Sequence, residues 1–390
     1  MDPKDFQSSA AGKVIRTLKD YWTFIPAPLP PVIHWSPALI SAVGAAERTL
    51  GKLDSLANTL PSPHILVRPF MRREAVLSSR IEGTRASLGD VYVYEAAQLS
   101  FLETASDVRE VHNYVKALDY GLERRGSFPV SLRLIREIHA ALMEGVRGEH
   151  LTPGEFRRSQ NWIGPPGSTL EVARFVPPPV DEMHTALNDL EKYLHAPSEL
   201  PSLVQAALIH YQFEAIHPFL DGNGRIGRLL ITLLLIEWDL LSQPWLNLSA
   251  YFEMQRTAYY DNLLAVSQRG DWENWLFFFL EGIRDQSADA ILCIERLQHL
   301  RSTYRERLRA ERAAERLMQA IDVLFERPIL NIRQLETEMK IPYRSAQRYV
   351  EKLEQLGILR EMTGRARNRL YQADEVLSAL DRTTGSKALR

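Results

Sequence analysis

Apolar residues recur at every third or fourth position over much of the chain, and this spacing predicts a mainly helical protein. We expect helices at residues 37–60 and through most of 105–148. Two more are expected at residues 180–195 and 201–213. A strongly apolar run at 229–236 predicts a further buried helix.

The first 36 residues lack this spacing, and we expect them to be irregular. Residues 22–31 are rich in proline and aromatic side chains, which could present an extended ligand to a partner protein. We favour a second interpretation, in which this arm packs on the rest of the chain through Trp22, Phe24 and Leu29.

Residues 217–228 form a polar stretch between two apolar segments and concentrate reactive side chains. The stretch reads His-Pro-Phe-Leu-Asp-Gly-Asn-Gly-Arg-Ile-Gly-Arg. Its Asp-Gly and Asn-Gly pairs permit a tight turn and let a ligand approach the backbone closely. The N–H groups at the start of the following helix, together with the helix dipole, favour an anion. The pattern therefore predicts a helix, a polar loop that binds a ligand, and a second helix.

The side chains of this stretch suit a phosphate site. Arg225 and Arg228 carry forked guanidinium donors that match phosphate oxygens. Asp221 is a hard oxygen ligand of the kind that Mg²⁺ accepts beside phosphates. His217 is a titratable base at the entrance of the loop. Each alone could be an ordinary turn or core residue, but the combination favours a functional site.

A second informative stretch spans residues 72–84 and predicts a helix that ends near Gly83, a favourable residue just after a helix. Ser78 and Glu82 are four positions apart and therefore share one face of that helix. Taken alone, these residues would be the solvated end of a surface helix.

The segment 153–179 is rich in proline and glycine, which argues against a helix. Its residues 174–176 could form a short strand in a two-strand flap, or the segment could be a plain loop. Farther along, residues 249–264 predict an aromatic helix whose rings belong mostly to the core.

The C-terminal third changes character. Residues 284–318 predict a long helix with alternating charges, which suits a connector or a dimer contact. Residues 313–380 then combine three short helices, the second capped by Asn331, with two strand-like runs, and this order resembles a winged helix. Basic residues follow its third helix and its wing: Arg344, Arg348, Lys352, Arg365, Arg367 and Arg369. Nearby glutamates dilute this charge, so DNA binding and protein docking both stay open.

The composition is that of an ordinary globular protein, with 390 residues, 45% of them hydrophobic and 25% charged. A net charge of −2 means that any nucleic-acid surface must be local. The single cysteine, Cys293, excludes an intramolecular disulfide and suits a reducing cytoplasm. The sequence shows no signal-peptide pattern and no apolar run of the roughly 18 residues that span a membrane. We therefore expect a cytoplasmic protein without membrane contact.

Residues 217–228 resemble the Fic/Doc family signature, His-Pro-Phe-x-Asp/Glu-Gly-Asn-Gly/Lys-Arg-x-x-Arg, at every specified position. The resemblance implies an enzyme that moves AMP from ATP to a Tyr, Ser or Thr hydroxyl of a target protein or of itself. Asp221 would hold Mg²⁺, and His217 would take the proton from the hydroxyl. The ATP phosphates would be held by Gly222, Asn223, Gly224, Arg225 and Arg228. A glycine in place of a lysine at position 224 favours adenylyl transfer over phosphotransfer.

The resemblance also covers the end of the helix near residues 70–84. Ser78-x-x-x-Glu82-Gly83 looks like the inhibitory motif that some family members carry on an N-terminal helix. Glu82 would pair with Arg228 and occupy the charge that the γ-phosphate of ATP needs. The enzyme would then be restrained by its own chain.

Two further places receive a role only from the resemblance. Arg174, Phe175 and Val176 would belong to a flap that holds the acceptor segment of a target protein by its backbone. Tyr260, the second tyrosine of a pair, would lie beside the nucleotide base.

Together these interpretations predict a mainly α protein, with a Fic-like helical core, a short β-hairpin flap and a C-terminal winged helix-turn-helix domain. The expected order is an N-terminal region at 1–104, a catalytic domain at 105–285, a connector helix at 286–312 and a winged-helix domain at 313–390. A homodimer is expected. Two other functions stay open: a DNA-binding regulator whose Fic-like part senses a nucleotide, and an enzyme that removes AMP with a water oriented by Glu82.

Overall fold

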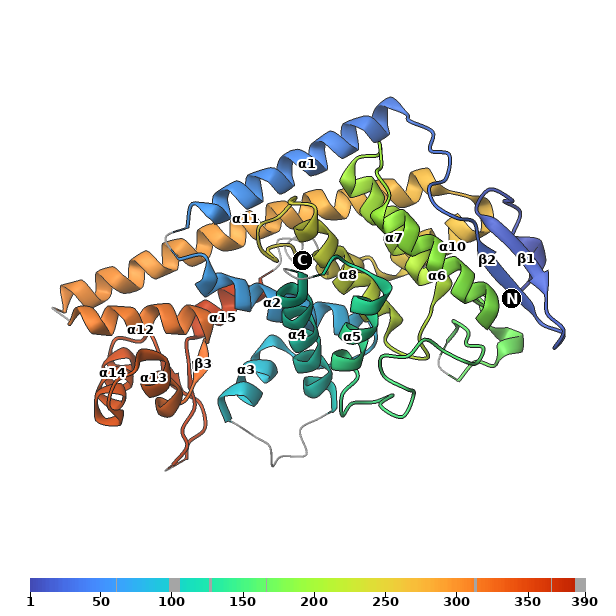
Figure 1. The fold of residues 1–390 in the computed structure, drawn as a ribbon. Coiled ribbons are helices and arrows are strands. Elements are labelled where there is room, and N and C mark those ends of the chain that lie inside the picture. Colours follow the sequence, from blue (N-terminus) through green and yellow to red (C-terminus); the bar gives the residue numbers. More distant parts are fainter. Residues whose placement is uncertain are drawn as a thin grey trace. The chain divides into compact units, whose positions relative to one another are not determined.

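The fold is given by a computed structural model, which describes residues 1–60, 62–97, 106–125, 128–165, 167–311, 314–365 and 367–382. It is mainly helical, as the sequence predicted (Figure 1). Its contacts divide the chain into two compact units. Unit 1 comprises residues 1–51, 113–242 and 248–285, and unit 2 comprises residues 52–112, 243–247 and 286–390.

Helices make up most of the described residues. In the first part of the chain they are α1 (Pro37–Asn58), α2 (His64–Ile81), α3 (Leu88–Ala97), α4 (Ser106–Arg125), α5 (Leu132–Leu142), α6 (Val180–His195) and α7 (Ser202–Ile216). In the second part they are α8 (Asn223–Glu237), α9 (Leu248–Met254), α10 (Arg256–Arg269), α11 (Trp272–Ala310), α12 (Glu315–Glu326), α13 (Ile332–Met339), α14 (Tyr343–Gln355) and α15 (Asp374–Asp381). Within the described ranges, every helix is too short or too polar to cross a membrane.

Unit 1 is organised around α7 and α8. Nearly all residues of both helices are buried, because apolar residues occupy most positions of α7 and of the part of α8 after Arg228, and such segments belong inside a core. The two helices pack against each other, α6 and α10 contact α7, and α5 contacts α8 (Figure 1). The polar loop between α7 and α8 is therefore held at both ends by buried helices.

The N-terminal residues form a hairpin and not the irregular arm that we expected. β1 (Gly12–Arg16) and β2 (Trp22–Pro26) pair antiparallel. Phe24 on β2 is buried, and its ring centroid lies 5.4 Å from that of Phe6 and 5.7 Å from that of Phe175. Packing through Phe24 is thus confirmed, whereas the irregular backbone was wrong because the buried ring anchors a strand that pairs with its neighbour.

Unit 2 joins α2 and α3 to the C-terminal elements. α12 and α15 pack against α2, and α3 packs against β3 (Ile329–Leu330). β3, β4 (Arg360–Glu361) and β5 (Tyr371–Gln372) form an antiparallel sheet in the order β3-β5-β4. α13 starts at a capping box made by Asn331 and Gln334, which confirms the predicted cap. β3 precedes α13 and α14, whereas β4 and β5 follow them, and the winged-helix assignment of these elements stays a prediction.

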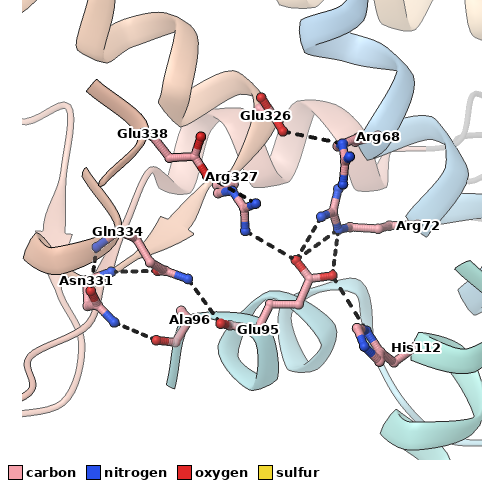
Figure 2. A network of polar contacts seen from close by, with 10 residues as sticks. All are labelled: Arg68, Arg72, Glu95, Ala96, His112, Glu326, Arg327, Asn331, Gln334 and Glu338. Carbon is pink, nitrogen blue, oxygen red and sulfur yellow. Dashed lines mark hydrogen bonds and ion pairs between the residues drawn. The ribbon is translucent and has the colours of Figure 1, made fainter. Parts of the chain in front are cut away.

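A polar network holds α2 and α3 to the C-terminal elements of unit 2 (Figure 2). Glu95 on α3 is its centre, since its carboxylate accepts a hydrogen bond from Arg72 Nε at 2.9 Å and lies 3.9 Å from Arg327 and 4.0 Å from His112. The Arg72 and Glu95 side chains are only 3% and 11% exposed. The side-chain amides of Asn331 and Gln334 also donate to the carbonyls of Ala96 and Glu95, in the last turn of α3.

Two helices differ in extent from those expected. The aromatic helix predicted at 249–264 is divided into α9 and α10, which meet at Gln255. The charged helix predicted at 284–318 begins earlier and ends earlier: it is the later part of α11, which ends at Ala310, and α12 begins at Glu315. The domain boundaries expected at 104–105 and 312–313 fall outside the described residues.

Candidate functional site

His217 ends α7 in a strained backbone conformation. Its φ and ψ are 49° and 62°, the left-handed region that residues with a bulky side chain rarely adopt. Such a residue costs roughly 1–2 kcal/mol, so its neighbours must hold it in place. Its ring Nδ1 lies 3.3 Å from the Glu214 carbonyl oxygen, and this acceptor favours the tautomer with the proton on Nδ1.

The three carbonyls at the start of the loop accept hydrogen bonds from one earlier segment. Arg157 donates from Nε to the His217 carbonyl at 3.0 Å and from its backbone N–H to the Pro218 carbonyl at 2.9 Å. Asn161 donates from Nδ2 to the carbonyls of His217 and Phe219, at 3.1 and 2.8 Å. The backbone of the loop is therefore fixed by residues about 60 positions away in the chain.

Asn223 closes the loop from its other end. Its Oδ1 accepts the Phe219 N–H at 2.8 Å, and its Nδ2 donates to the Phe219 carbonyl at 2.8 Å. Both ends of the side-chain amide are thus used on the loop itself, and only 2% of the residue is exposed. The Asn223 side chain is a brace of the loop in this structure, and its contact with a phosphate stays a prediction.

The start of α8 has the features of an anion site. Gly222 precedes the helix with a φ of 78°, and a Cβ at that position would lie 3.0 Å from Met143 Sδ, so glycine is favoured on both counts. The backbone N–H groups of Asn223, Gly224 and Arg225 open the helix, where an N–H has no carbonyl partner within the helix itself. The residues that the sequence predicted for phosphate binding thus lie together at one helix end.

Arg225 and Arg228 are buried in spite of their charge. Their residues are 1% and 2% exposed, and a spacing of three positions puts them on one side of α8. Arg225 lies 3.8 Å from the Asp221 carboxylate. Two desolvated guanidinium groups near a helix N-terminus suit a polyphosphate, because a charge is screened less inside a protein than in water.

Asp221 is the residue for which the sequence predicted a metal-binding role, and that role stays a prediction. Its side chain is 33% exposed, and its Oδ1 accepts the Gly222 N–H at 2.6 Å. Mg²⁺ is commonly held by one or two carboxylates together with the phosphates of a substrate. Within the described part of the chain, no group of three or more His, Cys, Asp or Glu residues could hold a metal ion. A single, partly exposed carboxylate would suit a metal ion whose other ligands come from a substrate.

His139 on α5 supports the middle of the loop. Its ring stacks on Phe219 with a centroid distance of 3.7 Å. Nδ1 accepts the Gly154 N–H at 2.8 Å, so the proton is on Nε2, which donates to the Asp221 carbonyl at 3.0 Å. Burial lowers the pKa of His139 to about 4, and the ring is therefore neutral at pH 7.

His210 on α7 links α8 to the tyrosine pair of α10. Its Nδ1 donates to the Gly227 carbonyl at 3.1 Å, and its Nε2 accepts from the Tyr259 hydroxyl at 2.8 Å. Burial lowers the pKa of His210 to about 3, which keeps it neutral. Tyr259 is buried, whereas Tyr260, whose ring centroid lies 5.1 Å from that of Tyr259, is only partly buried. Contact of Tyr260 with a nucleotide base stays a prediction.

Residues 159–178, here called the flap, contain one antiparallel bridge among their described residues, where the sequence left a two-strand flap or a plain loop open. Ile163 and Phe175 exchange N–H to carbonyl hydrogen bonds at 2.8 and 3.1 Å. Phe175 and Val176 are buried, and the Val176 carbonyl accepts an N–H from β2 at 2.9 Å. Arg174 is exposed and pairs with an aspartate of α10. Pairing stops at one bridge because prolines flank it, and the docking of a target by residues 174–176 stays a prediction.

Ser78, Glu82 and Gly83 lie at the end of α2, in unit 2. Gly83 has a φ of 97° and donates its N–H to a carbonyl of the last helical turn at 3.0 Å, which confirms the predicted helix end. Ser78 is buried and Glu82 is partly buried. The loop of residues 217–228 belongs to unit 1, and the pairing of Glu82 with Arg228 stays a prediction.

Four residues of the site were not singled out from the sequence: His139, Arg157, Asn161 and His210. Each of them contacts a backbone group far along the chain, and no local spacing reveals such a contact. The two histidines offered one weak signal, because each is a polar residue within an apolar run of a helix. A polar residue at a buried helix position needs a partner, and that partner is often a backbone carbonyl.

Family models and curated relatives match the part of the chain that holds these features. Residues 40–123 match the model of the Fic/DOC family N-terminal region, and residues 129–235 match that of the Fic/DOC family. The proteins named protein adenylyltransferase Fic from Drosophila erecta and Drosophila melanogaster are each 28% identical to this chain over 253 residues. That alignment covers 60% of this chain and 46% of each relative, so the chain spans less than half the length of these relatives.

The fold agrees with this assignment. The crystal structure of a Fic family protein from Desulfovibrio desulfuricans superposes with a TM-score of 0.57 at 21% sequence identity, over 88% of this chain and 98% of that one. The first family match contains all of α2, and the second contains all of residues 217–228. Both Fic/DOC family regions are thus present in order within residues 40–235, and the signature lies at the start of a buried helix of the second region.

Proposed function

We propose that this protein transfers AMP from ATP to a Tyr, Ser or Thr hydroxyl of a protein, and that Glu82 restrains the reaction. The observation that carries the proposal is the arrangement of one loop: His217 stands at its entrance, Asp221 in its middle, and Arg225 and Arg228 in the helix that follows. The names of the curated relatives support the same activity.

In this proposal His217 is the general base. A proton on Nδ1, shared with the Glu214 carbonyl, leaves the lone pair on Nε2 to accept the hydroxyl proton. The hydroxyl oxygen then bonds to the α-phosphorus of ATP, and the bond to the β-phosphate oxygen breaks, so that pyrophosphate leaves. A hydroxyl is a poor nucleophile at pH 7, and a well-placed base contributes roughly 10²–10⁴-fold to the rate.

The phosphates would be held by the start of α8. The first N–H groups of the helix and the guanidiniums of Arg225 and Arg228 suit the negative charge that ATP brings. Asp221 would hold Mg²⁺, which neutralises charge on the phosphates when bound. Gly224 leaves this helix start without a lysine, in keeping with adenylyl transfer.

The proposed restraint is electrostatic. If Glu82 pairs with Arg228, its carboxylate occupies the guanidinium that would otherwise bind the γ-phosphate. ATP then binds with its α-phosphate turned away from His217. Removing the Glu82 side chain should therefore raise AMP transfer without any change to the base.

The test is labelling with ATP that carries the label on the α-phosphate, in the presence of Mg²⁺. We expect weak protein labelling with the wild type, at least tenfold more with Glu82→Gly, and none with Glu82→Gly combined with His217→Ala. ATP labelled on the γ-phosphate is the matched control and should label nothing. If Glu82→Gly binds ATP but labels neither itself nor any protein of a cell extract, the proposed activity is wrong.

For the C-terminal elements we infer a DNA partner, from how the charges are arranged. Arg344 and Arg348 are exposed on α14, and so is Gln347 between them. The negative charge of Glu361 was counted against DNA binding in the sequence analysis. Its carboxylate accepts hydrogen bonds from the N–H groups of Thr363 and Gly364 and caps the turn between β4 and β5. An exposed helix with arginine and glutamine side chains matches the major groove of DNA.

Salt-dependent binding to a short DNA duplex, measured by fluorescence anisotropy, tests this partner. Arg344→Glu with Arg348→Glu should weaken binding at least tenfold. Lys352→Gln is the control, because Lys352 already pairs with Glu311 at 2.8 Å. Binding that does not fall with salt, or that is equal in both variants, would contradict a DNA partner.

A further inference from the structure

Arg157 is a fully buried arginine whose side-chain contacts are all backbone carbonyls. It is 0% exposed. Nε donates to the His217 carbonyl at 3.0 Å, one terminal nitrogen to the Ser159 carbonyl at 3.2 Å, and the other to the Pro178 carbonyl at 2.5 Å. The three nitrogens of the guanidinium thus reach three separate points of the chain.

Burial of this guanidinium is unfavourable in free energy, because the charged group loses its hydration. A buried cation without a carboxylate beside it loses several kcal/mol of hydration, at order of magnitude. Among the described residues, Arg157 has no ion pair. Burial lowers the pKa of Arg157 to about 10, so the group is still charged at pH 7, and charged donors make stronger hydrogen bonds to carbonyls than neutral ones do.

The three acceptors belong to two functionally different places. His217 carries the proposed base, at the end of α7. Ser159 and Pro178 are the first and last residues of the flap, and the Ile163–Phe175 bridge lies between them in sequence. The planar guanidinium of Arg157 therefore binds both ends of the flap and the backbone of His217.

We infer that Arg157 is a positioning residue, which sets His217 and the flap in one fixed relation so that an acceptor segment held by the flap meets the imidazole. This inference rests on the proposed AMP transfer. The planar guanidinium of an arginine suits this positioning role. A lysine ammonium presents its donors from a single point and cannot reach three carbonyls in different directions.

The expected effect falls on turnover and on the acceptor, and not on ATP. The contacts of Arg157 are with the carbonyl of His217 and with the flap, whereas the helix start, Arg225 and Arg228 are untouched. A misplacement of about 1 Å can cost about 10²-fold in rate. We therefore expect Arg157→Lys, made together with Glu82→Gly, to lower kcat about 10²-fold and to raise KM for the acceptor protein, with KM for ATP unchanged.

Arg158→Lys is the matched control. Arg158 is the next residue, its side chain is 85% exposed, and it pairs with Glu155 at 2.8 Å. The control should keep the kinetic constants of the Glu82→Gly protein. If Arg157→Lys does not fold, Arg157→Gln is the second variant, because a neutral amide removes the buried charge while keeping two donors.

Hydrogen exchange of the flap and of residues 213–220 separates this inference from the proposed function. Faster exchange in both segments of Arg157→Lys, at an unchanged melting temperature, supports the coupling even if Glu82→Gly transfers no AMP. Faster exchange in one segment only overturns it. Where AMP transfer is present, normal turnover in Arg157→Lys, or an equal loss of ATP binding and stability, also overturns it.

Discussion

At the scale of single residues, the site contains two buried arginines and two buried histidines, and burial lowers the pKa of both histidines. Arg225 and Arg228 are buried, and a bound anion would offset part of the hydration that their guanidinium groups lose. His139 and His210 are buried and neutral, and each uses one ring nitrogen as donor and the other as acceptor. The two imidazoles thus hold backbone groups of the loop and of α8 without adding positive charge.

The neutral state of His139 predicts a pH dependence of stability. Its pKa is about 4 in the folded protein and about 6.5 when unfolded, so between these values the unfolded chain binds the extra proton. Stability should be fully present above pH 6.5 and should fall with decreasing pH, by up to about 1.4 kcal/mol per unit from this group. Urea unfolding from pH 7 to 5 should show a shallower fall for His139→Gln than for the wild type.

His195→Gln is the control for that experiment, because His195 is exposed at the end of α6. It should show the pH dependence of the wild type. Equal slopes for His139→Gln and the wild type would mean that His139 is not the neutral, buried group described here.

At the scale of elements, an aromatic cluster joins the N-terminal hairpin to the flap within unit 1. Phe24 of β2 contacts the rings of Phe6 and Phe175, and Phe175 also makes the bridge of the flap. Support for the flap therefore comes from a strand near the start of the chain. Loss of the hairpin should loosen the flap as well as the N-terminus.

Phe24→Ala tests this dependence. Truncating a buried phenylalanine costs roughly 3–5 kcal/mol, and we expect that loss in urea unfolding together with faster hydrogen exchange at Ile163 and Phe175. Leu18→Ala lies in the turn between β1 and β2, is fully exposed, and should change neither quantity. Unaltered exchange in the flap of Phe24→Ala would show that the hairpin does not support it.

Features that depend on neighbouring residues were predicted well, and features that depend on distant ones were not. The loop of residues 217–228 holds its reactive groups in one stretch, and Asn331 caps a helix that starts at the next residue. Gly83 ends α2 in the same local way. The role of Arg157 could not be predicted, because its carbonyl partners His217 and Pro178 are brought to it by packing alone.

At the scale of the whole molecule, the two units share the chain in an interleaved way. α2, which ends at the proposed inhibitory motif, belongs to the same unit as the C-terminal helices. α12 and α15 pack against it, and the Glu95 network ties it to α3 and to Arg327 (Figure 2). The helix that would restrain the enzyme is thus stabilised by residues near the end of the sequence.

Glu95→Gln should expose this dependence. Breaking one side of a buried ion pair costs roughly 3–5 kcal/mol, because Arg72 would keep its charge without its partner. We expect a lower unfolding free energy and faster hydrogen exchange in α2. Glu338→Gln is the control, since Glu338 is a more exposed partner of Arg327, and it should cost less than about 1 kcal/mol. Equal costs for the two variants would contradict a central place for Glu95.

The positions of the two units along the sequence also determine which unit is completed first during synthesis on the ribosome. All of unit 1, including the complete loop of residues 217–228, has been made once residue 285 is joined, whereas α12 and α15 come from the stretch that follows. At about 5–20 residues per second, several seconds separate the two. During that interval the nascent chain contains the whole loop, but α12 and α15, which pack on α2, have not yet been synthesised.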